Sequence, residues 1–372
     1  MKKLTTIILT IGVVSSVLIL GCAEEKKGIK IGVITPLSGA SAKYGEDIKR
    51  GYDMAVEEIN ENGGIKGRKI KLTYEDSEGK PEKAVSAAQK LINQDKVIAI
   101  LGALWSSPTL AVAPIAEKNK VVLLSSGSSS PEITKAGDYI FRNEISDELG
   151  ATEGAKHYYN LGYKKIAGFY VNNDYGVGYR DITRRIYVEL GGTVTISEMF
   201  EQDATDFRTQ LLKIKDTEPD AILIVSYKEA ILILKQMEEL GIKKQVLGST
   251  LFEDAEIVEK LGKTADGVIY VYYGTFDPES EDRIVVDFLN KFRSKYKIDP
   301  GYYAPIGYDA ANILGSAMQK GGFSSEGIKT ALYSTRDFPG ISGSTSFDQN
   351  GDVIKPVVLK TINKGKFVKY ER

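Results

Sequence analysis

The sequence predicts an α/β protein of two lobes, each built on a doubly wound parallel sheet. Short apolar runs of strand length alternate with amphipathic segments of helix length, which is the pattern of βα units in a parallel sheet. The alternation repeats in two similar halves. The chain has 372 residues, more than one ordinary hydrophobic core organises, so two lobes are expected.

The first half of the chain predicts a complete set of βα units. Apolar runs bounded by turn signals predict strands over residues 29–34, 70–75, 97–101, 120–124 and 139–142. Helices are expected over residues 46–60, 81–93 and 108–118, with another starting at Pro131. Ile48, Ala55 and Val56 share one face of the first helix, and the Gly63-Gly64 pair ends it.

The second half repeats this alternation. Its expected strands are residues 165–170, 193–199, 221–225, 246–247 and 267–272. Its expected helices are residues 147–161, 180–190, 207–215, 228–240 and 255–261. Three more helices are expected over residues 283–296, 305–319 and 325–332, and short strands over 344–347, 357–361 and 366–369. No shift in composition marks a flexible linker, so strand-like crossings are expected to join the lobes.

Two Ser-rich loops, residues 102–107 and 125–130, follow successive strands of the first half. Ligands of open α/β sheets bind beyond the carboxyl ends of the strands, so both loops lie where a site is expected. Pro108 and Pro131 suit the first turns of the helices that follow. Helix N-termini with hydroxyl groups form a seat for a carboxylate or another anion. The alternative is that Ser and Gly are simply common loop residues.

Composition and motifs exclude several classes of function. A net charge of −1 provides no basic surface for nucleic acid. The single Cys allows neither an intrachain disulfide nor a Cys-based metal cluster, and the single His, His157, rules out schemes that need two histidines. No dinucleotide-binding motif follows the first strand, and no P-loop motif occurs. We therefore expect no catalysis, no cofactor and no bound metal.

Residues 1–22 have the features of a targeting segment that takes no part in the fold. Lys2 and Lys3 form a positive start, and residues 4–20 form an apolar core. Leu20-Gly21-Cys22 then resembles a lipobox, the site where bacterial lipoproteins are cleaved and lipidated on Cys. The other interpretation is a retained transmembrane anchor, because the apolar run is nearly long enough to span a bilayer. Either interpretation places the rest of the chain on the outer face of the cytoplasmic membrane.

Several short motifs stand in order from about residue 29 to the C-terminus. They are residues 32–39 (GVITPLSG), 62–68 (NGGIKGR), 130–132 (SPE), 173–176 (NDYG), 307–310 (GYDA) and 347–352 (FDQNGD). Together with the two Ser-rich loops, they resemble the branched-chain amino-acid-binding (Leu/Ile/Val-binding) proteins of ABC importers. This resemblance implies a type I periplasmic-binding fold, in which two Rossmann-like lobes close around a ligand in the cleft between them.

The resemblance also implies where the lobes divide. The implied N-terminal lobe comprises residues 28–146 and 277–354, and the implied C-terminal lobe comprises residues 147–276 and 355–372. Three crossings then form the hinge, near Ser146, Phe276 and Lys355.

Site residues carry over from the family position by position. For the ligand carboxylate, Ser106 matches a family Ser and Ser129 a family Thr, while Gly127 or Ser128 supplies a carbonyl. Two aromatic positions of the family match Tyr44 and Tyr175. A third matches Tyr302 or Tyr303, of which we adopt Tyr303. The last matches Ser226 or Tyr227, of which we favour Tyr227. Trp105 either lines the cleft or caps the sheet edge. Hydroxyls and N–H groups would seat a carboxylate, and aromatic walls would bury an apolar side chain.

One position departs from the family pattern. Leucine-binding relatives carry an acid where this chain has Thr250. An unpaired ammonium group in a closed cleft is costly, so two outcomes stay open. Either Glu253 or Asp254 restores the charge pair, or the ligand is a carboxylate, keto acid or amide without the amine.

The leading hypothesis is a lipid-anchored extracytoplasmic receptor that delivers an amino acid, or a similar small carboxylate, to the membrane subunits of an ABC permease. A ligand-sensing module and an enzyme on the same fold are the competing hypotheses, because a fold alone does not settle function. The missing catalytic constellation argues against an enzyme.

Overall fold

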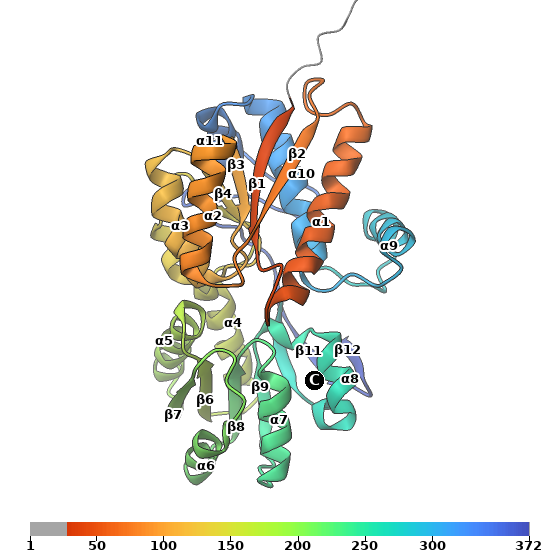
Figure 1. Ribbon diagram of the computed structural model, residues 1–372. Helices are drawn as coiled ribbons and strands as arrows, with labels where there is room; N and C mark the ends of the chain where they lie inside the picture. Colours follow the sequence, from red (N-terminus) through yellow and green to blue (C-terminus); the bar gives the residue numbers. More distant parts are fainter. Residues whose placement is uncertain (1–27, 372) are drawn as a thin grey trace, which may run out of the picture.

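The computed structural model describes residues 28–371, so the leader and Cys22 lie outside the described residues. Two sheets, each flanked by helices, lie end to end in the molecule (Figure 1). The first sheet has the order β2-β1-β3-β4-β5, and the second has the order β12-β11-β10-β9-β8-β6-β7. The two-sheet α/β architecture predicted from the alternating pattern is therefore confirmed.

The first sheet is parallel throughout. Its strands are β1 (Ile29–Thr35), β2 (Ile70–Asp76), β3 (Ala99–Gly102), β4 (Val122–Ser125) and β5 (Ile140–Arg142). Its connecting segments are α1 (Ala42–Glu61), α2 (Pro81–Lys90), η1 (Leu91–Asp95), α3 (Ser106–Lys118) and η2 (Pro131–Lys135). Strands β3 to β5 are buried along their whole length, which explains why their sequences are continuous apolar runs without alternation.

The second sheet combines parallel and antiparallel pairing. Its strands are β6 (Lys165–Val171), β7 (Thr193–Phe200), β8 (Ala221–Val225), β9 (Gln245–Gly248), β10 (Ile269–Tyr273), β11 (Val357–Asn363) and β12 (Lys366–Lys369). Its helical segments are α4 (Asp147–Asn160), α5 (Asp174–Glu189), α6 (Arg208–Asp216), α7 (Ala230–Glu239), η3 (Thr250–Phe252), α8 (Ala255–Leu261) and η4 (Gly262–Ala265). The prediction of a wholly parallel sheet is wrong at one edge, because β11 pairs antiparallel with both β10 and β12.

Three further helices follow β10. They are α9 (Arg283–Tyr296), α10 (Tyr303–Gly321) and α11 (Ser325–Tyr333). Helix α10 lies alongside α1, and α11 packs against α10 (Figure 1). We call the first sheet with α1–α3 and α9–α11 the first lobe, and the second sheet with α4–α8 the second lobe.

The chain passes between the lobes after β5, after β10 and after α11, in segments that include the expected crossings near Ser146, Phe276 and Lys355. The implied boundaries of the lobes stay a prediction. The expected strand at residues 344–347 is wrong, because Thr345 and Phe347 form only isolated bridges, with Phe338 and Val353.

Candidate functional site: an aromatic cavity between the lobes

A cavity lies where the loops of the two lobes face each other. The space between atoms in it, open solvent included, is about 300 Å³. Its walls are Trp105, Ser106, Gly127, Ser129, Glu144, Tyr175, Tyr227, Thr250, Leu251, Tyr273 and Tyr303. Both Ser-rich loops contribute, as do the ends of strands β8, β9 and β10. Seven of the ten residues expected in the site therefore line one cavity.

The first Ser-rich loop brings Ser106 to the cavity at the start of α3. Gly102 permits this path, because it has a φ of +121° and a Cβ atom there would lie 2.1 Å from the carbonyl oxygen of Ile34. The Ser106 hydroxyl accepts a hydrogen bond from the backbone N–H of Ser130 at 3.2 Å. Its own hydrogen is left to donate to a ligand oxygen, and the N-terminus of α3 favours an anion beside it.

The second Ser-rich loop separates the expected roles of Ser128 and Ser129. The Ser128 hydroxyl is fully buried and bonds with Thr109 Oγ1 at 2.6 Å and with the Ala103 carbonyl at 3.1 Å. Ser128 therefore joins the two loops and does not line the cavity. Ser129 lines it, but its hydroxyl donates to Asp147 Oδ2 at 2.9 Å. The expected donation from this hydroxyl to a ligand carboxylate is not available in this arrangement.

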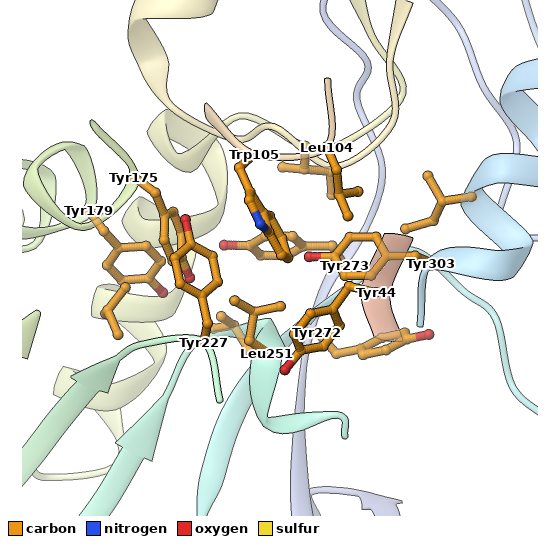
Figure 2. Packing of buried hydrophobic residues seen from close by; sticks show 14 of the residues in the cluster. Tyr44, Leu104, Trp105, Tyr175, Tyr179, Tyr227, Leu251, Tyr272, Tyr273 and Tyr303 are labelled. Carbon is orange, nitrogen blue, oxygen red and sulfur yellow. The ribbon is translucent and has the colours of Figure 1, made fainter. Parts of the chain in front are cut away.

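Aromatic rings from both lobes form the walls of the cavity (Figure 2). The ring of Trp105 lies 4.6 Å from that of Tyr227 and 5.7 Å from that of Tyr303, measured between centroids. Tyr175 packs 5.6 Å from Tyr227. Trp105 thus faces the cleft, and these rings offer the apolar surface that an aliphatic side chain requires.

Tyr44 lies next to this aromatic cluster but does not line the cavity. Its ring packs edge-on at 5.5 Å from Trp105 and at 6.0 Å from Tyr303. Its hydroxyl donates to Asp254 Oδ2 at 3.0 Å. Tyr44 therefore supports the wall from outside and joins α1 to the second lobe.

Buried polar atoms in the walls lack partners. Among the described residues, Trp105 Nε1, the Tyr175 and Tyr273 hydroxyls and Thr250 Oγ1 are buried without a hydrogen bond. Most buried polar groups in folded proteins are hydrogen-bonded, so several orphans around one cavity indicate that a polar ligand or water completes them.

Sequence reasoning missed three residues of the wall, Glu144, Leu251 and Tyr273. Tyr273 ends strand β10, and the rule that ligands bind beyond the carboxyl ends of the strands would have found it. Glu144 lies between β5 and α4, close to the expected crossing at Ser146. Burial raises the pKa of the Glu144 carboxyl to about 7.

Glu253 and Asp254, the two acids that could pair with an ammonium group, do not face the cavity. Glu253 accepts from the Tyr270 hydroxyl and pairs with Lys360, and it does not line the cavity. Asp254 caps α8 by accepting from the N–H of Glu256, and it pairs with Lys43 at 2.6 Å. Both carboxylates are thus engaged outside the cavity.

Contacts between the lobes close the cavity at its rim. Lys43 of α1 pairs with Asp254 and Glu256 of the second lobe. The backbone N–H of Asp174 donates to Ser107 Oγ at 3.4 Å. The two lobes are therefore in direct contact, as expected of a closed cleft.

Replacing Ser106 by alanine should weaken ligand binding about tenfold or more. A hydrogen bond to a charged group contributes roughly 1.5–3 kcal/mol, and 1.4 kcal/mol corresponds to a factor of about ten in affinity. Calorimetric titration measures the change, with the melting temperature of the ligand-free variant as the control for folding. An unaltered affinity would remove Ser106 from the site.

Two searches of the described residues bear on other functions. No group of three or more His, Cys, Asp or Glu side chains within residues 28–371 is placed to hold a metal ion. None of the helices in this part of the chain combines the length and the apolar character needed to cross a membrane.

Comparison with known proteins agrees with this geometry. Residues 28–366 match the family model described as periplasmic binding protein. The leucine-binding protein LivK from Thermotoga maritima is 30% identical with a TM-score of 0.85, over 92% of this chain and 98% of that chain. The branched-chain amino acid transporter substrate-binding protein LivJ from Streptococcus pneumoniae, in complex with isoleucine, is 31% identical with a TM-score of 0.83, over 91% and 97%.

A more distant structure shares the fold. The ABC-transporter solute-binding protein from Rhodopseudomonas palustris BisB5, solved with 3,4-dihydroxy benzoic acid, has a TM-score of 0.83 at 22% identity, over 92% of this chain and 95% of that chain. At that identity the likeness concerns the fold alone. With a family model that matches nearly the whole described chain, and two lobes that enclose a small cavity, this chain belongs to the periplasmic binding protein family.

Proposed function

We propose that this protein is the extracytoplasmic substrate-binding component of an ABC importer and binds an amino acid with an apolar side chain. The observation that carries the proposal is a cavity between the lobes with Ser106 at the helix start on one side and aromatic walls around it. Ser106 at the start of α3 suits the carboxylate, and the rings of Trp105 and Tyr227 suit the side chain. Similarity to LivK and LivJ supports the same class of ligand.

Titration of leucine, isoleucine and valine against their keto acids tests the proposal. We expect the amino acids to bind tightly and the keto acids weakly. Mass spectrometry of ligand carried through purification provides an independent readout, because a closed cleft retains its ligand. Tight binding of the keto acids, with none for the amino acids, would replace the proposal by its alternative, a receptor for carboxylates, keto acids or amides without an amine.

We also propose that the mature chain begins at Cys22 and is anchored by lipid on that residue. The Leu20-Gly21-Cys22 sequence supports this, and Cys22 is the only Cys of the chain. A single acyl chain binds membranes only marginally, so stable anchoring requires more than one. Cys22→Ala should release the protein from the membrane or leave it unprocessed. Unchanged retention with the same N-terminus would contradict the lipobox interpretation.

A further inference from the structure

We propose that the Glu144 carboxylate is the counter-ion of the ligand's ammonium group and makes the site selective for zwitterionic amino acids over amine-free acids. The inference rests on the proposed function, and it assigns the charge recognition to the crossing after β5 rather than to Glu253 or Asp254, the two acids that the sequence offers for this role.

The cavity contains one ionisable acid and no base. Glu144 is the only carboxylate among the lining residues, and none of these is Lys, Arg or His. A ligand that carried only a carboxylate would therefore meet neutral donors at the Ser-rich loops and an acid nearby. A zwitterion places its ammonium group against the acid and its carboxylate against the donors, so both of its charges are compensated.

Two hydrogen bonds hold the Glu144 carboxylate in place, and its oxygens can accept further hydrogen bonds. Oε1 accepts from the backbone N–H of Ile145 at 2.9 Å, and Oε2 accepts from the Tyr302 hydroxyl at 3.1 Å. An ionised carboxylate has about four lone-pair sites, so two donors leave room for the N–H groups of an ammonium ion. Burial raises the pKa of this carboxyl to about 7, because its hydrogen bonds and the nearby cations offset only part of the lost hydration.

The charged groups near Glu144 are engaged with other partners. Lys355, which lowers the pKa of Glu144, donates its ammonium hydrogens to Ser342 Oγ at 2.8 Å and to the Asn143 carbonyl at 3.3 Å. Arg142 Nε pairs with Asp352 at 2.6 Å. Among the described residues, neither cation forms an ion pair with Glu144.

The other carboxylate of this crossing faces a different group. Asp147 Oδ2 accepts from the Ser129 hydroxyl, and Asp147 does not line the cavity. The remaining groups that interact with Glu144 are four tyrosines, Tyr175, Tyr272, Tyr302 and Tyr303. Burial raises the pKa of each and keeps them neutral near pH 7. Glu144 is thus the acid that presents uncompensated charge to the ligand.

Two isosteric variants, Glu144→Gln and Glu253→Gln, distinguish the two acids. Each is titrated by calorimetry with leucine and with its keto acid, alongside the unaltered protein. We expect Glu144→Gln to weaken leucine by about 100-fold or more, because it removes one partner of a buried ion pair, while the keto acid binds as well as before or better. Glu253→Gln should leave leucine affinity within about threefold, because the part-buried ion pair of Glu253 with Lys360 lies outside the cavity.

Further measurements keep the result interpretable. Binding of the keto acid by Glu144→Gln, together with its melting temperature, shows that the variant is folded, and Glu144→Asp should retain part of the preference for the amine. Leucine affinity unchanged in Glu144→Gln, or lost selectively in Glu253→Gln, would overturn the inference while the proposed function stands. Failure of the unaltered protein to bind any amino acid would instead overturn the proposed function.

Discussion

Leucine should bind about 100-fold more weakly at pH 5 than at pH 7.5. In the ligand-free protein, burial holds the pKa of Glu144 at about 7, whereas an ammonium group beside it favours the anion and lowers that pKa in the complex. Between the two pKa values, binding must expel the proton from Glu144. Affinity therefore falls by up to about tenfold for each pH unit below 7, while the ligand's ammonium group stays protonated.

Calorimetry in buffers with different ionisation enthalpies measures this proton directly. At pH 6, close to one proton should be released for each leucine bound, and Glu144→Gln should abolish that release. Asp147→Asn is the matched control, because burial raises the pKa of Asp147 to about 8 but its carboxylate faces Ser129. The dependence below pH 7 should persist in this variant. An affinity that is constant from pH 5 to 7.5 would contradict the assignment of Glu144.

Replacing Arg142 by alanine should lower the free energy of unfolding by about 3–5 kcal/mol, the cost of breaking a buried ion pair by removing one partner. The Arg142 side chain is fully buried, and its Nε and Nη2 donate to the two carboxylate oxygens of Asp352 at 2.6 and 2.8 Å. Its Nη1 donates to the carbonyls of Ser129 and Ser130. The variant removes four hydrogen bonds that these acceptors receive, and it creates a cavity.

Denaturant unfolding checks this expectation. Arg142→Lys is the conservative control, because it keeps a charge but cannot reproduce the two-pronged contact with Asp352. It should be less destabilising than Arg142→Ala. Since Arg142 also supports the loop that carries Ser129, both variants should weaken ligand binding. A midpoint for Arg142→Ala that equals that of the unaltered protein would show that the pair contributes nothing to stability.

The alternation of apolar runs predicted most of the fold because burial on both faces of a parallel strand leaves a continuous apolar signature. Strand β8, AILIV, is buried at every position, and its five apolar residues predict the strand with the same bounds. The strand expected at residues 344–347 does not form, because its residues make only isolated bridges and join neither sheet. The pairing of β11 with β10 joins residues about 90 positions apart, which local patterning cannot reveal.

The sequence also determined which residue types meet at the site. The family motifs keep their order and spacing along the chain, so the resemblance assigns site positions to Ser106, Ser129, Tyr175, Tyr227, Thr250 and Tyr303. These residues line the cavity with Trp105. What each hydroxyl does depends on neighbours from other units. Ser128 and Ser129 are adjacent in the loop, yet one bonds to Thr109 and the other to Asp147.

Only the tertiary structure decided which acid faces the ligand. By sequence, Glu253 follows the strand end that the family pattern marks, whereas Glu144 lies near the expected crossing at Ser146 and belongs to no motif. The folded chain turns Glu253 toward Lys360 of the antiparallel edge and buries Glu144 beside Tyr302, a residue 158 positions away. The environment of a carboxylate is set by such distant contacts, because burial and neighbouring charges act through space and not along the chain.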